Sequence, residues 1–330
     1  MLKNVSMGWL LALSFAALAN AGVTAIEKSG DLWLTQEVLT GDYSSVAFNT
    51  GATTQFVAVG PNGADAIYKT DAWHTIHASD GAYTDVVCNS ASWDQFIAAK
   101  SAGGVDYIPW NSAQDTGVTG VYAAVAKNQG GTNCYFGVSS TGAVEEIYYY
   151  SDGWRTAATT AATGYTRIAS NNFANQVFGL NAGGIDLIYY LSGTWYSYQA
   201  VNGAFSLLVG DDQEIDTAYA AGPDGAAYVY YLGGSYQTAQ INGTAYTALA
   251  PIGGDELGFF GALASGGIEK VTFDADGANV VTEPVLTSGQ FSHLMNDSIS
   301  PSLLMAIEVP EPASLGLLAL GLLGLMRRRS

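Results

Sequence analysis

The chain has 330 residues, of which 48% are hydrophobic and 12% charged, so one large domain or two small ones can bury a sizeable core. Its formal net charge is −18. Between Gly22 and Pro312 the basic residues are Lys28, Lys69, Lys100, Lys127, Arg155, Arg167 and Lys270. They are too few and too scattered to form a groove that follows phosphates, which argues against nucleic-acid binding.

Residues 1–21 are predicted to be a signal peptide. Lys3 precedes an apolar run from Trp9 to Ala19, and Ala19-Asn20-Ala21 forms a small-residue cleavage site. A basic start, a short apolar stretch and such a site are typical of secretory signals. A membrane anchor is the alternative, but the apolar run is short for it. We therefore expect an exported protein.

Residues 22–308 repeat a four-stranded unit at a spacing of roughly 40 residues. In each unit a strand B begins with an aromatic residue: Tyr43, Tyr83, Tyr122, Tyr165, Phe205, Tyr246 or Phe291. An apolar strand C follows, for example QFVAV at Gln55, and then a glycine turn and a strand D, for example AIYK at Ala66. A strand A headed by Trp33, Trp73, Trp154, Trp195 or Tyr236 opens a unit. Short antiparallel strands repeated at this period predict a β-propeller.

The number of units predicts an all-β propeller with seven four-stranded blades. The last unit has strands near Val280, Phe291 and Leu303 but lacks a strand D. The segment from Val23 to Lys28 resembles a strand D and leads into Trp33. We therefore expect the N-terminal strand to join the last blade and close the ring, which removes an open sheet edge.

Catalytic chemistry has little support in the sequence. His74 and His77 are three positions apart on a predicted strand, so they point to opposite faces and cannot share a metal ion. The sequence contains no nucleophile elbow, zinc-protease motif or phosphate loop. We therefore expect no catalytic residues, no metal site and no enzymatic activity.

The acidic segment from Asp274 to Asn279, DADGAN, contains part of a calcium loop but lacks its distal glutamate. A plain turn is the preferred interpretation, so we expect no cofactor. Calcium binding is the alternative.

Candidate ligand-binding residues lie in the B–C loops, which differ in every unit, whereas the C–D turns are nearly uniform. Divergent polar loops are typical of recognition surfaces, so we select Trp93, Phe173, Asp211 and Asp255. The alternative is drift in unconstrained loops. The tryptophans of strand A predict packing between blades. The pattern GGIDLIYYLSGTW, residues 183–195, also resembles repeats of propeller lectins, which implies sugar stacking between blades.

Cys88 and Cys134 are the two cysteines of the chain. Cys88 ends a strand B and Cys134 begins the strand C of the next unit, so both lie at B–C loop ends of adjacent blades. Export permits a disulfide between them if their Cα atoms come within about 7 Å. Two buried thiols are the alternative.

Residues 309–330 form a distinct C-terminal tail. Val309 precedes Pro310, Glu311 and Pro312, an uncharged run from Ala313 to Met326 follows, and Arg327, Arg328 and Arg329 end the tail. As a helix the run spans about 21 Å, short of a hydrocarbon core of about 30 Å, but terminal arginines anchor such a segment on the cytoplasmic side. The tail closely resembles the PEP-CTERM sorting signal of Gram-negative bacteria. This resemblance implies an exosortase-type membrane protease as partner, a transient inner-membrane anchor and a bacterium that makes exopolysaccharide.

The sequence thus predicts an exported, non-catalytic propeller protein of the cell surface or extracellular matrix. It is expected to bind a glycan or another envelope or exopolysaccharide component. The alternatives are a propeller lectin with repeated sugar sites between its blades, or a secreted enzyme that acts on polysaccharide.

Overall fold

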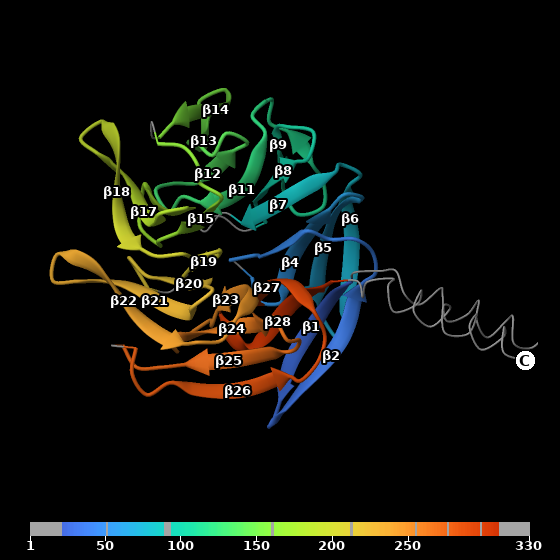
Figure 1. Cartoon of the computed structure of the whole chain (residues 1–330). Helices are drawn as coiled ribbons and strands as arrows, with labels where there is room; N and C mark the ends of the chain where they lie inside the picture. The colour runs from blue at the N-terminus through green and yellow to red at the C-terminus, as the bar shows by residue number, and fades with distance from the viewer. Residues whose placement is uncertain are drawn as a thin grey trace, which may run out of the picture.

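The computed structural model describes residues 22–309, except residues 51, 89–93, 160–161, 212–213, 255, 276 and 298. Within this part, seven four-stranded sheets surround a central axis (Figure 1). The prediction of a seven-bladed β-propeller is therefore confirmed. The predicted signal peptide and the apolar run of the tail lie outside the described residues. In the described part, no helix is long and apolar enough to cross a membrane.

The first four blades follow one another along the chain. Blade 1 contains β3 (Ser45–Phe48), β4 (Gln55–Gly60), β5 (Gly63–Lys69) and β6 (Trp73–Ser79). Blade 2 contains β7 (Tyr83–Cys88), β8 (Phe96–Lys100), β9 (Val105–Ile108) and the short β10 (Gln114–Asp115). Blade 3 contains β11 (Tyr122–Lys127), β12 (Cys134–Ser139), β13 (Val144–Tyr150) and β14 (Gly153–Ala158). Blade 4 contains β15 (Arg167–Ser170), β16 (Gln176–Asn181), β17 (Gly184–Leu191) and β18 (Thr194–Asn202).

The last three blades include the two ends of the propeller. Blade 5 contains β19 (Leu207–Gly210), β20 (Ala218–Gly222), β21 (Gly225–Leu232) and β22 (Ser235–Asn242). Blade 6 contains β23 (Tyr246–Pro251), β24 (Gly258–Leu263), β25 (Ile268–Thr272) and β26 (Val281–Leu286). Blade 7 contains β27 (Phe291–Asp297), β28 (Ser300–Glu308), β1 (Val23–Ser29) and β2 (Leu32–Leu39).

The blades are offset by one strand from the predicted repeat units. Strand B is the innermost strand of each sheet, and strand A of the following unit is the outermost strand of the same sheet. The strand near Val280 therefore belongs to blade 6, where Val281 pairs with Thr272. This corrects its assignment to the last unit. The offset arises because β5 and β6 are joined by a tight turn, so hairpin pairing keeps strand A with the blade before it.

The ring closes in blade 7, where β1 pairs with β28 and β2 forms the outer edge. Val23 lies opposite Ile307 and Glu27 lies opposite Leu303 in an antiparallel ladder. The predicted closure by the N-terminal strand is confirmed. The N-terminus contributes a second strand, β2, because strand D (β1) and the following strand A (β2) form one hairpin.

Seven clusters of buried hydrophobic side chains lie between the blades, one at each interface of the described ring. Between blades 6 and 7, for example, Phe260 packs with Ile26 and Leu304, and all three are fully buried. Since each sheet is covered on both faces, its middle strands are apolar at successive positions rather than alternating.

The aromatic residue that precedes or begins each inner strand crosses its own sheet. In five blades it is a tyrosine whose hydroxyl donates to a carboxylate on the third strand. The pairs are Tyr43–Asp65, Tyr83–Asp106, Tyr122–Glu145, Tyr165–Asp186 and Tyr246–Glu269. In blades 5 and 7 the aromatic residue is Phe205 or Phe291, and the strand register places Ala227 or Thr24 at the carboxylate position. Hydroxyl and carboxylate are thus present together or absent together.

A small residue on the second strand makes room for each aromatic ring. In blade 3 this residue is Gly137, and a Cβ atom built on it would lie 2.4 Å from a ring carbon of Tyr122. Gly261 has the same relation to Tyr246 in blade 6, at 2.3 Å. The ring of the inner-strand aromatic residue lies over the second strand, and close packing therefore requires a small residue at that position.

Closure of the ring predicts that Ile26 is essential for stability. Ile26 is buried between blades 6 and 7 only if β1 occupies its place beside β28. We expect Ile26→Ala to lower the free energy of unfolding by about 2–5 kcal/mol, measured by urea denaturation. Leu34→Ala is the control, because Leu34 on the neighbouring strand is 54% exposed. Equal stability of the Ile26→Ala variant and the unmodified protein would contradict the closure.

The tyrosine–carboxylate pairs predict loss of stability in alkali. Burial, helped by the neighbouring carboxylate, raises the pKa of Tyr43, Tyr83, Tyr122, Tyr165 and Tyr246. A pKa raised on folding stabilises the fold below the unfolded value of about 10, and this stability is lost as the pH rises through the folded value. We therefore expect the free energy of unfolding to fall steeply above about pH 10.

The comparison for this measurement is Tyr122→Phe, which leaves Glu145 without its donor. Its free energy of unfolding should be lower by about 1–3 kcal/mol at neutral pH. The free energy of unfolding of this variant should fall less steeply as the pH rises, since one titrating hydroxyl has been removed. A flat profile for the unmodified protein through the alkaline range would show that these hydroxyls are not held by the fold.

Candidate functional site

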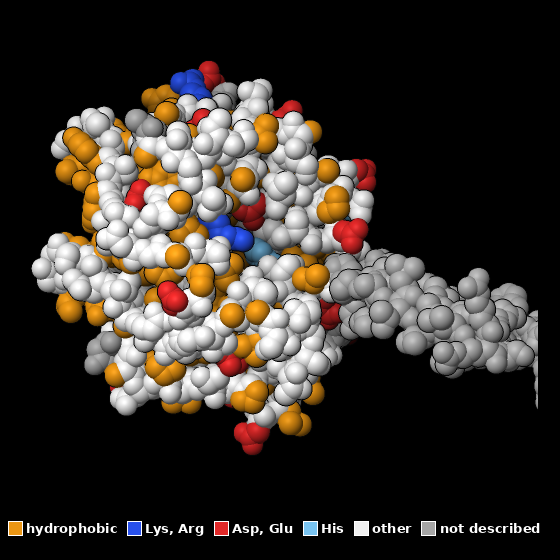
Figure 2. Space-filling model, in the orientation of Figure 1, with side chains coloured by type: hydrophobic (Ala, Val, Ile, Leu, Met, Phe, Trp, Pro, Cys, Tyr) orange, Lys and Arg blue, Asp and Glu red, His pale blue; other side chains and the backbone are white. Residues whose placement is uncertain are grey.

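A channel of about 850 Å³ runs along the propeller axis and is lined by the inner strands of all seven blades. Its width follows from small wall residues such as Ala124, Ser206 and Thr247. In Figure 2 a histidine, a basic and an acidic side chain lie together in the middle of the face. Among the described histidines, His293 is the one that lines the channel.

A ring of hydroxyls lies on the channel wall directly after the crossing aromatic residues. Its members are Ser44, Thr84, Thr166, Ser206, Thr247 and Ser292, and Ala123 takes the place in blade 3. Ser44 Oγ donates to the Tyr83 carbonyl of the next blade at 3.2 Å, and Thr247 Oγ1 donates to the Phe291 carbonyl at 2.8 Å. These hydroxyls connect adjacent blades and make the wall polar without adding charge.

Asp85 connects three blades from inside the channel. Its carboxylate accepts hydrogen bonds from Ser45 Oγ at 2.7 Å, from the Val86 amide at 2.9 Å and from the Val125 amide at 2.9 Å. Because Ser45 and Val125 belong to the blades on either side, the carboxylate has a structural role.

His293 faces Asp85 and Arg167 in the channel. His293 is half-buried, and its burial among the inner strands lowers its pKa; Asp85 opposes this shift and Arg167 adds to it. The imidazole is therefore neutral at neutral pH and can both donate and accept a hydrogen bond. No sequence motif predicts this group, because its members lie on the three separate strands β7, β15 and β27.

The predicted ligand residues have different surroundings. Phe173 is 45% exposed at the B–C loop of blade 4. Asp211 is 3% exposed, and its carboxylate accepts a hydrogen bond from the Tyr219 hydroxyl at 2.8 Å. The buried carboxylate thus contacts its own blade, and its role as a ligand contact stays a prediction. Trp93 and Asp255 lie outside the described residues.

Polar residues at the ends of the inner strands hold the B–C loops in place. Asn49 Nδ2 donates to Asp94 Oδ1 of the next blade at 2.6 Å, and Asn171 Nδ2 donates to Asp216 Oδ1 at 3.1 Å. Asp94 and Asp216 have φ values of 58° and 60°, which orient them back toward the preceding blade. The B–C loops differ in sequence, but in both cases an asparagine at the end of an inner strand bonds an aspartate of the next blade.

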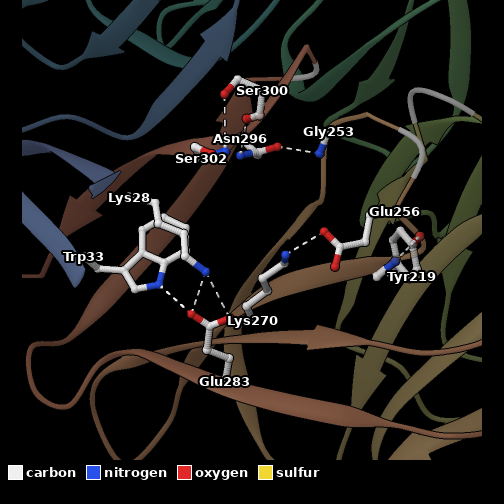
Figure 3. A network of polar contacts seen from close by, with 11 residues as sticks. Lys28, Trp33, Tyr219, Gly253, Glu256, Lys270, Glu283, Asn296, Ser300 and Ser302 are labelled. Carbon is white, nitrogen blue, oxygen red and sulfur yellow. Dashed lines mark hydrogen bonds and ion pairs between the residues drawn. The ribbon is translucent and has the colours of Figure 1, made fainter. Parts of the chain in front are cut away.

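The tryptophans of strand A pack between blades, as their positions predict. Trp33 meets Phe260 of blade 6 edge-on at 5.8 Å, and its Nε1 donates to Glu283 Oε1 at 3.2 Å. Lys28 Nζ lies 2.9 Å from the same carboxylate and 5.3 Å from the centre of the indole ring (Figure 3). Trp73, Lys69 and Glu27 repeat this arrangement between blades 7 and 1.

A tyrosine cluster lies on the outer hairpins of blades 4 and 5. Tyr189 stacks on Tyr196 at 5.6 Å and meets Tyr198 at 5.9 Å, all within the β17–β18 hairpin. Tyr198 lies 6.4 Å from Tyr236 of blade 5, which lies 5.1 Å from Tyr231. Both hairpins project side by side from the rim of the propeller (Figure 1).

Three members of the tyrosine cluster are open to solvent, with Tyr196 45%, Tyr198 43% and Tyr231 48% exposed. No charged residue occurs from 187 to 210 or from 225 to 254, although the chain as a whole is strongly acidic. Partial burial, followed by the nearby Tyr231, raises the pKa of Tyr198, so its hydroxyl stays protonated. The cluster is therefore a neutral aromatic surface, and the charge-free stretches were the sequence signal for it.

The described residues contain no group of three or more histidine, cysteine, aspartate or glutamate side chains that could hold a metal ion. The segment from Asp274 to Asn279 forms a turn in which the Gly277 amide donates to the Asp274 carbonyl at 2.8 Å. Asn279 Nδ2 donates to Asp274 Oδ2 at 2.5 Å. The Asp274 carboxylate thus has a partner within the turn.

Cys88 is buried and Cys134 is half-buried, on the adjacent blades 2 and 3. Each is a thiol in the structure, and Cys88 Sγ lies 3.7 Å from Thr50 Oγ1 of blade 1. Burial, followed by Glu146, raises the pKa of the Cys134 thiol. The disulfide stays a prediction, which titration of thiols in the denatured, exported protein can check.

Residues 308–330 match the PEP-CTERM protein-sorting motif. The tail is a PEP-CTERM sorting signal. Such a signal implies export, sorting to the cell envelope and processing by an exosortase, a membrane protease. Since the match covers only the tail, it assigns a destination and leaves the activity of the propeller open. No curated protein sequence matches this chain.

Solved structures with the same fold differ widely in sequence. The β-propeller domain of Cps50 (Swd1) from Myceliophteria thermophila aligns with a TM-score of 0.61 at 8% identity, over 82% of this chain and 96% of that one. YCF48 from Cyanidioschyzon merolae gives 0.56 at 12% identity, over 81% and 95%. The WD40 β-propeller domain of Doa1 gives 0.55 at 12% identity, over 90% and 98%. These likenesses show the fold alone.

The PEP-CTERM motif predicts proteolytic removal of the tail. In a bacterium with an exosortase, mass spectrometry of envelope and medium fractions should find chains that end near Pro310 to Pro312. A variant with Pro310→Ala and Pro312→Ala should accumulate chains that end at Ser330, because the recognition sequence is lost. Glu37→Ala, an exposed change on β2, is the control. Only full-length chains from the unmodified protein would contradict the prediction.

Proposed function

We propose that this chain is a non-catalytic envelope or matrix protein whose propeller binds a polysaccharide through the tyrosine cluster. The exposed, uncharged aromatic surface of blades 4 and 5 carries the proposal. A soluble protein seldom exposes contiguous large apolar groups without a binding role. The PEP-CTERM tail supports a location where exopolysaccharide is within reach.

The chemistry of the cluster suits sugar faces. Tyrosine offers a broad ring for stacking on the C–H face of a pyranose and a hydroxyl for a hydrogen bond. Its side chain has two rotatable angles, so little entropy is lost when a ligand orders it. The rings of Tyr189, Tyr196 and Tyr198 already contact one another, which pre-organises the surface further.

Uncharged polar side chains lie on the same two hairpins as these rings. Ser197 and Gln199 lie on β18, and Gln237 and Thr238 lie on β22, all of them exposed. Their amides and hydroxyls match the hydrogen-bonding groups of a sugar chain. The stretches that carry the rings contain no charged residue, and the nearby Asp216 carboxylate accepts a hydrogen bond from the Tyr236 hydroxyl at 2.7 Å.

A single surface is favoured over repeated lectin-type sites. The aromatic residues at the head of strand A in other blades are engaged between blades, as Trp33 is with Phe260 and Glu283. Ring contacts also join blades 1 and 2 and blades 2 and 3, but those of blades 4 and 5 include the exposed rings of Tyr196, Tyr198 and Tyr231. We therefore propose one binding surface per chain.

Loss of the exposed rings should weaken polysaccharide binding. We expect the double variant Tyr196→Ala, Tyr198→Ala to bind about 5- to 150-fold more weakly, at roughly 0.5–1.5 kcal/mol for each of the two lost aromatic contacts. Affinity electrophoresis against a panel of neutral and acidic polysaccharides measures this. The double variant Tyr196→Phe, Tyr198→Phe should retain most of the affinity, because the rings remain.

The matched control is Tyr150→Ala, since Tyr150 is a 61% exposed tyrosine on the outer hairpin of blade 3 and lies outside the cluster. Its binding should equal that of the unmodified protein. Equal loss from Tyr150→Ala and from the cluster variant would reject the assignment of the surface. Failure of the unmodified protein to bind any polysaccharide of the panel would reject the function.

A further inference from the structure

Arg167 is the starting point, because it lines the channel and begins β15 with its side chain exposed. Five of the six other basic residues of the propeller each lie within ion-pair distance of a carboxylate, namely Lys28, Lys69, Lys100, Arg155 and Lys270. Across the described parts of residues 22–309, no carboxylate lies within 4.0 Å of the Arg167 guanidinium. In a chain with net charge −18, a guanidinium without a carboxylate partner is unusual.

Asp85 and Lys127 share the channel wall with Arg167. The carboxylate of Asp85 is close enough to influence His293, but both of its oxygens already accept hydrogen bonds from Ser45 and Val125. These neutral donors leave the negative charge of Asp85 in place. Among the described residues, no carboxylate comes within 4.0 Å of Arg167, so its guanidinium N–H groups are available to a ligand.

The geometry points to a binding site in the channel for a small sugar acid, with its carboxylate on Arg167. A guanidinium presents a planar fork of donors that matches a carboxylate with two parallel hydrogen bonds.

The channel wall specifies the remainder of the ligand. Thr166 Oγ1 and Ser206 Oγ donate to backbone carbonyls of their own blades, so their lone pairs stay available to accept from a ligand hydroxyl. His293 adds a neutral imidazole. A wall of hydroxyls and small side chains that also carries Arg167 and Lys127 suits a polyhydroxylated carboxylate better than an apolar acid. The volume of about 850 Å³ falls within the usual range of small-molecule sites and accommodates one or two sugar rings.

This site is distinct from the tyrosine cluster, which lies on the rim and contains no cation. The two surfaces therefore differ in ligand chemistry: the rim binds the neutral face of a sugar, and the channel binds a carboxylate. Their tests are independent, because each uses residues that the other does not contact.

Isothermal titration calorimetry on the full-length chain with D-glucuronate tests the site, with D-glucose as the uncharged comparison. We expect glucuronate to bind and glucose to bind at least about tenfold more weakly, because it lacks the carboxylate. Arg167→Gln should weaken glucuronate binding by a similar factor, and Arg167→Lys should lie between, since it keeps the charge and loses the planar fork.

The matched control is Arg155→Gln, which removes an equal charge from an exposed hairpin where Arg155 pairs with Asp152. It should leave glucuronate binding unchanged, as should the double variant Tyr196→Ala, Tyr198→Ala. Absence of glucuronate binding by the unmodified protein, equal binding of glucose, or full binding by Arg167→Gln would each overturn the proposal. The melting temperature of every variant confirms that the propeller has folded.

Discussion

The antiparallel pairing of β1 with β28 is the constraint on which the rest of the structure depends. It joins Val23 to Ile307 across nearly the whole described chain and places both ends in one blade. Every blade has an apolar face toward each neighbour, so an open ring would expose two such faces to water. Closure covers both and removes the strand edges at which other chains could pair. The channel exists because the seven inner strands are held in a closed ring.

Polar groups fasten this ring in a way that explains part of the acidic composition. Carboxylates such as Asp65 and Glu145 accept hydrogen bonds from buried tyrosines and thus have no need of a lysine or arginine partner. Asp85 is held by a hydroxyl and two backbone amides. The protein can therefore carry many more acidic than basic residues while its buried carboxylates keep hydrogen-bond partners.

The two candidate surfaces arise from departures from the repeat. Most tryptophans and tyrosines at the head of strand A pack between blades, but the hairpins of blades 4 and 5 extend further and expose Tyr196 and Tyr231. The inner strands present many small or hydroxyl side chains to the axis, and single blades add charged or ionisable groups such as Arg167 in blade 4 and His293 in blade 7. Both candidate binding surfaces thus lie where a blade departs from the repeated pattern.

The sequence by itself determined the number of blades and their period, because the aromatic residue and the glycine turn recur in the units. It also determined the closure, because the strand D that the last unit lacks stands at the N-terminus. It also determined the sorting tail, whose motif is contiguous. Tertiary structure decided the rest. Asp211 has the composition of a loop ligand but is buried against Tyr219. The grouping of Asp85, Arg167 and His293 depends on which inner strands face each other across the axis, and residues more than a hundred positions apart meet there only after all seven blades have packed.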